Sequence, residues 1–119
     1  MIIESKQLLE VVVKAIDDKR GEEIIALDVQ GISLLADYFV ICHGNSEKQV
    51  GAIVDSVANA AREQGIEVGR IEGKDSGKWV LADLGDIVLH VFHGEERSFY
   101  NLEKLWSDAP MVDVTGMVD

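Results

Sequence analysis

Residues 38–50 read YFVICHGNSEKQV, and this stretch passes from a predicted strand directly into a predicted helix. The first five residues form a nearly continuous apolar run, which is typical of a strand covered on both faces. Ser46 is predicted to cap the helix, with Gln49 three residues later completing a capping box. Apolar residues then recur at helical spacing until Gly65, where the helix is predicted to end: Val50, Ile53, Val54, Val57, Ala58 and Ala61.

The segments before this stretch add one helix and one strand. Apolar residues at helical spacing predict a helix over residues 5–19, with Ser5 as its N-cap and Gly21 just beyond a basic last turn. The β-branched and apolar residues 23–29 predict a strand that ends near a glycine. The chain is therefore expected to begin with a helix followed by two consecutive strands.

The segments after the stretch complete the sheet. A weaker strand is predicted over residues 67–71, and a hairpin over residues 78–93, whose strands are joined by a tight turn at residues 84–86. Apolar residues in the segment 95–106 predict a closing helix. Strands interleaved with helices in this order imply an α+β domain, in which a mixed β-sheet is packed by helices.

The length of the chain, 119 residues, fits one domain, and no linker divides it. We assign residues 1–109 to this domain. Residues 110–119 form a C-terminal tail that contains the only proline and no clear periodicity, so we expect it to be flexible. The sequence shows no export signal, and no apolar run approaches the ~18 residues that a membrane span needs. It therefore predicts a cytoplasmic protein with no membrane contact.

The charge balance disfavours direct binding to nucleic acids. The chain has 22 acidic and 11 basic residues, a formal charge of −11. Proteins bind nucleic-acid phosphates by displacing counterions with Lys and Arg, so we expect little or no direct nucleic-acid binding. Basic proteins are the more natural partners, although an acidic surface also serves solubility alone.

The glycine junction at residues 44–46 has no accompanying catalytic motif. Helix N-termini attract phosphates, but this junction is neither a dinucleotide-binding fingerprint nor a Walker loop. Nucleotidyltransferases with such a junction hold Mg²⁺ through an Asp-x-Asp motif on the following strand, and residues 67–72 contain none. His90 and His93 are three apart on one predicted strand, so they point to opposite faces. The sequence therefore predicts no catalytic, cofactor or metal site.

One strand of the hairpin has the character of a binding surface. Trp79, Leu81 and Asp83 share one face of this strand. Trp79 also stands beside the charged loop 72–78, and tryptophans half out of the core are frequent interface anchors. Packing of Trp79 under the closing helix explains its position equally well. Asp83, next to the hairpin turn, is expected to form the turn rather than a metal site.

Six ungapped runs, spread over about residues 5–109, carry a family resemblance. They are Ile25–Val29, Asp37–Cys42, Gly44–Ser46, Trp79–Asp86, His90–His93 and Phe99–Trp106. In these runs the chain resembles the ribosomal silencing factor family, also called the Iojap family. The tail 110–119 lies outside the resemblance.

The resemblance implies a nucleotidyltransferase-like fold without the catalytic carboxylates, and a regulator rather than an enzyme. It also implies binding to the large ribosomal subunit through its protein number fourteen, beside the intersubunit face. A bound factor would block joining of the small subunit when nutrients are scarce, with no cofactor. The resemblance also implies a role in large-subunit biogenesis. We place the partner-binding residues within one of the runs: Trp79, Leu81, Leu84 and Asp86.

Two other functions remain open from the residues alone. A small nucleotidyltransferase-like enzyme would use Gly44 and Ser46 with scattered acids, and would bind nucleotides in a Mg²⁺-dependent way. A homodimeric scaffold acting away from the ribosome would instead use its apolar surface for self-association. A homodimer in isolation is compatible with either function that is not enzymatic.

Overall fold

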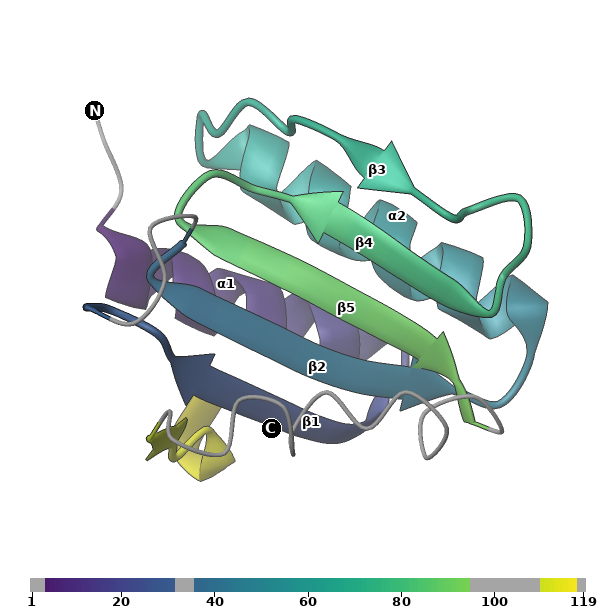
Figure 1. Cartoon of the computed structure of the whole chain (residues 1–119), viewed down its shortest axis with the longest axis horizontal. Helices are drawn as coiled ribbons and strands as arrows, with labels where there is room; N and C mark the ends of the chain where they lie inside the picture. The colour runs from purple at the N-terminus through teal and green to yellow at the C-terminus, as the bar shows by residue number, and fades with distance from the viewer. Residues whose placement is uncertain (1–3, 32–35, 95–109, 118–119) are drawn as a thin grey trace.

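The computed structural model describes residues 4–31, 36–94 and 110–117 of the chain. In these residues two helices lie behind a six-stranded sheet (Figure 1). The elements are α1 (Ser5–Asp18), β1 (Glu22–Asp28), β2 (Tyr38–Gly44), α2 (Glu47–Glu63), β3 (Ile71–Glu72), β4 (Trp79–Asp83), β5 (Ile87–His93), β6 (Met111–Val112) and the 3₁₀ turn η1 (Thr115–Met117). The prediction of an α+β domain with a mixed sheet is confirmed.

The sheet has the strand order β3-β4-β5-β2-β1-β6. Its central strands β2 and β5 run parallel, and every other neighbouring pair is antiparallel. A parallel pair needs a long crossover, and α2 lies within the one between β2 and β5. The predicted hairpin is confirmed, because Trp79 pairs with Phe92 and Asp83 with Val88.

The main core lies between the sheet and the two helices. The apolar stripe predicted for α2 is wholly buried, as is the equivalent stripe of α1. Alternate residues of the strands meet these stripes and are themselves buried: Ala26, Val40, Cys42, Val80, Ala82, Leu89 and Val91. Cys42 is buried, as its apolar surroundings in the sequence predict.

The start of α2 ties distant parts of the chain together. The Ser46 hydroxyl accepts the backbone N–H of Gln49 at 3.0 Å, which confirms the predicted cap. The predicted capping box does not form, because the Gln49 side chain bonds to other residues instead of the Ser46 N–H. This side chain accepts the N–H of Asn45 at 2.7 Å and donates to the carbonyls of Lys19 and Arg20 at 3.2 and 2.9 Å. This glutamine therefore fixes the turn between α1 and β1.

Two predicted boundaries near the edges of the fold are wrong. The N-cap of α1 is Glu4 rather than Ser5, and the Glu4 N–H donates to the side chain of Gln7 at 3.4 Å. The strand expected over residues 67–71 is only Ile71–Glu72. Two isolated hydrogen bonds precede it: the Gly69 N–H donates to the Asp83 carbonyl, and the Asp83 N–H donates to the Arg70 carbonyl, both at 2.8 Å. Exposed polar residues there offer too little apolar area for a longer regular strand.

Residues 110–117, in the segment expected to form a flexible tail, include an edge strand of the sheet. Met111 and Val112 pair with β1 as the edge strand β6, and Asp28 N–H donates to the Pro110 carbonyl at 2.9 Å. Met117, in η1, is 9% exposed and belongs to the core. The segment is too short to show periodicity, but its apolar residues pack against the main core between the sheet and the two helices. The predicted helix 95–106 lies outside the described residues.

Candidate partner-binding surface

The strands have a second face, away from α1 and α2, which we call the front face. The predicted alternation in β4 is confirmed: Trp79, Leu81 and Asp83 are half-buried, and the two residues between them are buried. Strand pairing places Phe92 and His90 opposite Trp79 and Leu81 on this face. The front face continues across β2, β1 and β6 through Phe39, Ile41, Ile25, Leu27 and Met111.

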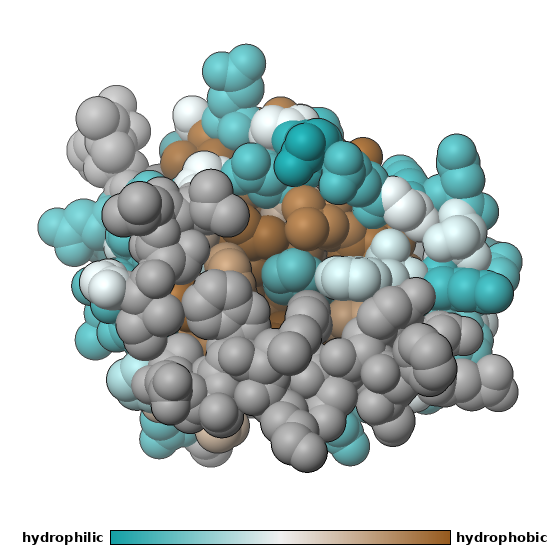
Figure 2. Space-filling model, in the orientation of Figure 1, coloured by the Kyte–Doolittle hydropathy of each residue, from teal (hydrophilic) through white to brown (hydrophobic). Residues whose placement is uncertain are grey.

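The front face is mainly hydrophobic, with a separate small core of its own. Figure 2 shows hydrophobic residues gathered in the middle of this side of the molecule. The cluster has a buried part and a half-buried part. Leu27, Val29, Ala36, Phe39, Ile41 and Phe92 are buried, and Ile25, Trp79 and Val88 are packed against them while partly accessible. The sheet thus has apolar residues on both faces, as the continuous run in β2 indicates.

His90 and Phe92 help to hold Trp79 on the front face. Its indole Nε1–H donates to Nδ1 of His90 at 3.2 Å, and its ring stacks on Phe92 with the centroids 5.3 Å apart. His90 in turn makes an edge-to-face contact with Phe39 at 5.5 Å. The tryptophan is therefore half in and half out of the core, with a fixed orientation.

A pocket of about 200 Å³ lies beside this tryptophan, lined by Glu72, Gly73, Trp79 and Leu81. Gly73 has a φ of +84°, and a Cβ there would overlap the carbonyl oxygen of Trp79. Only glycine fits this close approach of two backbones. The loop that follows is tied to α2, because Lys74 Nζ lies 2.6 Å from Asp55 Oδ1. The close contact between the backbones of Gly73 and Trp79 thus sets one wall of the pocket.

The four residues predicted to bind a partner do not form one surface. Trp79 and Leu81 lie together on the front face, two positions apart on β4. Leu84 is 1% exposed and packs in the helix-side core, so its side chain supports the hairpin rather than offering a contact. Asp86 is exposed, but at the opposite end of the hairpin from Trp79. Asp83 forms the turn as predicted, since its Oδ1 accepts the Gly85 N–H at 2.9 Å.

The polar side chains at the glycine junction contact one another. His43 Nε2 lies 3.1 Å from Glu22 Oε2, and Asn45 Nδ2 donates to Glu22 Oε1 at 3.2 Å. Strand parity puts His90 on the front face and His93 on the other, as expected. Within residues 4–31, 36–94 and 110–117, no three His, Cys, Asp or Glu side chains are grouped to hold a metal ion.

Comparison with known proteins gives the family. Residues 2–119 match the family model described as "Ribosomal silencing factor during starvation". This chain belongs to the ribosomal silencing factor family. The match includes the residues 110–119 that the sequence resemblance left out, in keeping with the place of β6 in the sheet.

Similar proteins extend from bacteria to mitochondria. The protein named Ribosomal silencing factor RsfS from Bacillus subtilis is 60% identical over 109 residues, which are 92% of each chain. A crystal structure from Bacillus halodurans has 55% identity and a TM-score of 0.82, and covers 92% of this chain and 99% of that one. The mouse protein named Mitochondrial assembly of ribosomal large subunit protein 1 is 30% identical over 83% of this chain and 45% of its own length.

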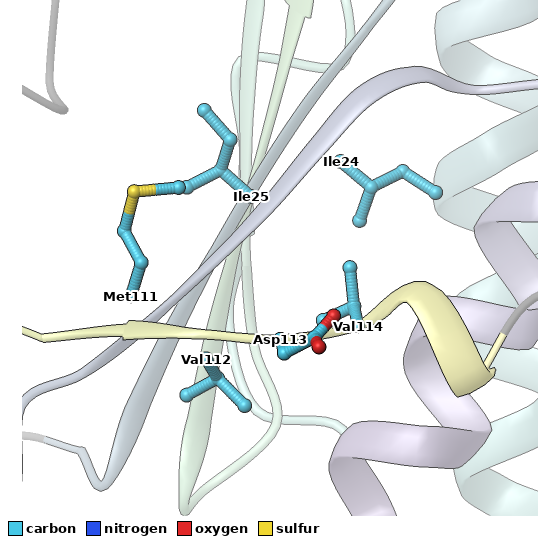
Figure 3. Close-up of a pocket in the computed structure, with 6 residues that line it drawn as sticks. All are labelled: Ile24, Ile25, Met111, Val112, Asp113 and Val114. Atoms are coloured by element: carbon cyan, nitrogen blue, oxygen red, sulfur yellow. The ribbon is translucent and has the colours of Figure 1, made fainter.

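Sequence reasoning about this silencing factor family member missed Met111. Its side chain is 70% exposed, and it lines a second hollow, of about 320 Å³, with residues of β1 and the segment after β6. Figure 3 shows the side chain of Met111 beside that of Ile25, while Val114 and Ile24 lie on the other side of the strands. An apolar residue in a supposed tail gave no signal that it extends the front face. No helix in the described part of the chain is long and apolar enough to cross a membrane.

Proposed function

We propose that this family member binds the large ribosomal subunit and blocks joining of the small subunit when nutrients are scarce. The contact is with the basic protein number fourteen of the large subunit, near the intersubunit face. The mechanism is steric exclusion in the cytoplasm, with no catalysis and no cofactor. The family description names starvation, and the mouse relative's name refers to assembly of the large subunit. A role in large-subunit biogenesis fits the same binding.

The observation that carries the proposal is the half-buried pair Trp79 and Leu81 on the front face. Both side chains present apolar area beside a preformed pocket, as anchors of protein interfaces do. Asp86 would contact the partner at the rim, with Leu84 holding the turn from below. The formal charge of −11 favours a basic protein and opposes attachment to the surrounding RNA.

The test is co-sedimentation with isolated large and small ribosomal subunits at low and moderate salt. We expect pelleting with the large subunit alone, and loss of subunit joining when the protein is added. The double variant W79A/L81A should bind more weakly by at least ~2 kcal/mol. V11A, which trims a half-buried side chain on α1, is the matched control and should bind normally.

Two results would contradict this proposal. One is failure of the folded protein to pellet with either subunit. The other is unchanged affinity of a folded W79A/L81A variant, which would remove the assignment of the contact surface. Mg²⁺-dependent nucleotide binding would then favour the enzyme, and a front-face dimer would favour the scaffold.

A further inference from the structure

A hydrogen bond to His90 and a stacked ring both orient the indole of Trp79. Its Nε1–H donates to His90 Nδ1 across the β4–β5 pair at 3.2 Å. The two rings are 6.0 Å apart and tilted by 35°, while the indole stacks on Phe92 with an interplanar angle of 23°. Stacking fixes the plane of the indole, and the hydrogen bond fixes which edge points inward. Together they select one arrangement of a half-exposed side chain.

His90 is well placed to act as a fixed acceptor. It is 6% exposed and lies between Trp79 and Phe39, a residue of the neighbouring strand β2 with which it makes an edge-to-face contact. Because Nδ1 accepts, the ring proton must be on Nε2, the neutral tautomer with one donor and one acceptor. Burial lowers the pKa of His90 from 6.5 to about 4, so the ring stays neutral and the acceptor is retained near pH 7.

We infer that His90 is a positioning residue for partner binding: it holds the indole of Trp79 against Phe92, so that the pocket bounded by Glu72, Gly73 and Leu81 is formed before the partner arrives. An anchor that is ordered in advance spares the complex the entropy cost of ordering it. This inference rests on the proposed function, because it assumes that the Trp79 surface is the one that the large subunit contacts.

Two substitutions at one position separate the acceptor from the ring. H90N keeps a hydrogen-bond acceptor near the position of Nδ1, whereas H90F keeps an aromatic ring and removes the acceptor. The first readout is solvent exchange of the Trp79 indole N–H in the free protein, measured by NMR. The chain has two tryptophans, so the W79F variant assigns the resonance. The second readout is the affinity for isolated large ribosomal subunits.

We expect faster indole exchange in H90F, and a Kd that is weaker by about five- to tenfold, the worth of one hydrogen bond. H90N should restore both values to within about twofold of the native protein. The variant W79F removes the donor instead. In the W79F background, H90F should weaken binding no further, because the bond that it breaks is already absent. If H90F unfolds, H90L removes the acceptor in its place and should show the same faster indole exchange and the same loss of affinity.

The outcomes distinguish this inference from the proposed function. Native affinity in a folded H90F variant whose indole exchange is accelerated overturns the positioning role and leaves the ribosomal function standing. Equal loss of binding in H90N and H90F also overturns it, because an acceptor at this position would then not restore binding. Failure of the native protein to bind large subunits, with the exchange difference still present, overturns the proposed function instead.

Discussion

The two faces of the same sheet differ in chemistry, although they are built from alternate residues of the same strands. The helix side uses aliphatic residues that are completely buried, such as Val40, Val80 and Leu89. The front face adds aromatic rings and a histidine to its aliphatic residues, and leaves Trp79 and Leu81 partly accessible. Aliphatic packing is what stability requires, whereas a fixed, partly exposed aromatic group is what recognition requires. The difference separates the residues that hold the fold from those proposed to bind.

The largest expected effect comes from trimming the helix side. Leu89→Ala should lower the free energy of unfolding by about 2–5 kcal/mol, because Leu89 is fully buried between the sheet and the helices. Leu81→Ala on the front face should cost less than about 1 kcal/mol of stability. Chemical denaturation measures both. Equal destabilisation by the two substitutions would show that the faces are not divided in this way.

A second prediction concerns the pH dependence of stability on the front face. Burial lowers the pKa of His90 from 6.5 to about 4, so the unfolded chain takes up a proton at a higher pH than the folded chain. The stabilising effect of the neutral ring is complete above pH 6.5 and is lost as pH falls towards 4. The loss should approach about 3 kcal/mol, at ~1.4 kcal/mol per pKa unit.

The control for the pH prediction is H90F, which carries no titrating ring. Its unfolding free energy should fall less than that of the native protein between pH 6.5 and 4. The difference between the two curves isolates His90 from the carboxylates that titrate in the same range. Parallel curves for the two proteins would mean that His90 is solvated and charges normally in the fold.

A third prediction tests whether backbone geometry builds the pocket. Gly73→Ala should cost about 1–3 kcal/mol of stability, because its φ is positive and the added Cβ overlaps the Trp79 carbonyl. Gly85→Ala is the matched control: its φ of +86° is similar, but nothing lies within 4 Å of the added Cβ. Thermal unfolding should show a smaller loss for Gly85→Ala, and large-subunit binding should weaken only for Gly73→Ala.

The local parts of this fold are predictable from the sequence, and the parts that depend on distant pairing are not. The strand, cap and helix within residues 38–63 follow from an apolar run, a serine and a stripe that are all close in the chain. The two-residue strand β6 shows no such pattern. It exists because β1, far away in sequence, offers it an edge. Short strands of this kind are fixed by tertiary contacts, which a single sequence does not display.

The candidate site divides in the same way. Alternation along β4 was enough to place Trp79 and Leu81 on one face. It did not reveal the acceptor of the indole proton, since the contact with His90 follows from the register between two strands. Leu84 was assigned to the partner-binding surface because it lies in the same run of the family resemblance as Trp79 and Leu81. Its side chain is instead buried in the core between the sheet and the helices. Its backbone N–H donates to the Ile87 carbonyl at 2.9 Å and so closes the turn.

The smallest expected effect concerns the ion pair between Lys74 and Asp55, which joins the loop beside the pocket to α2 on the opposite side of the sheet. The atoms are 2.6 Å apart, but the side chains are 49% and 59% exposed, so solvent screens the attraction. A double-mutant cycle with K74A and D55A should give a coupling below about 1 kcal/mol that shrinks further in high salt. Large-subunit affinity should change by less than about twofold, because Gly73 rather than the ion pair shapes the wall beside Trp79. A coupling of several kcal/mol, or a large loss of binding in K74A, would mean that the helix side controls the front face through this loop.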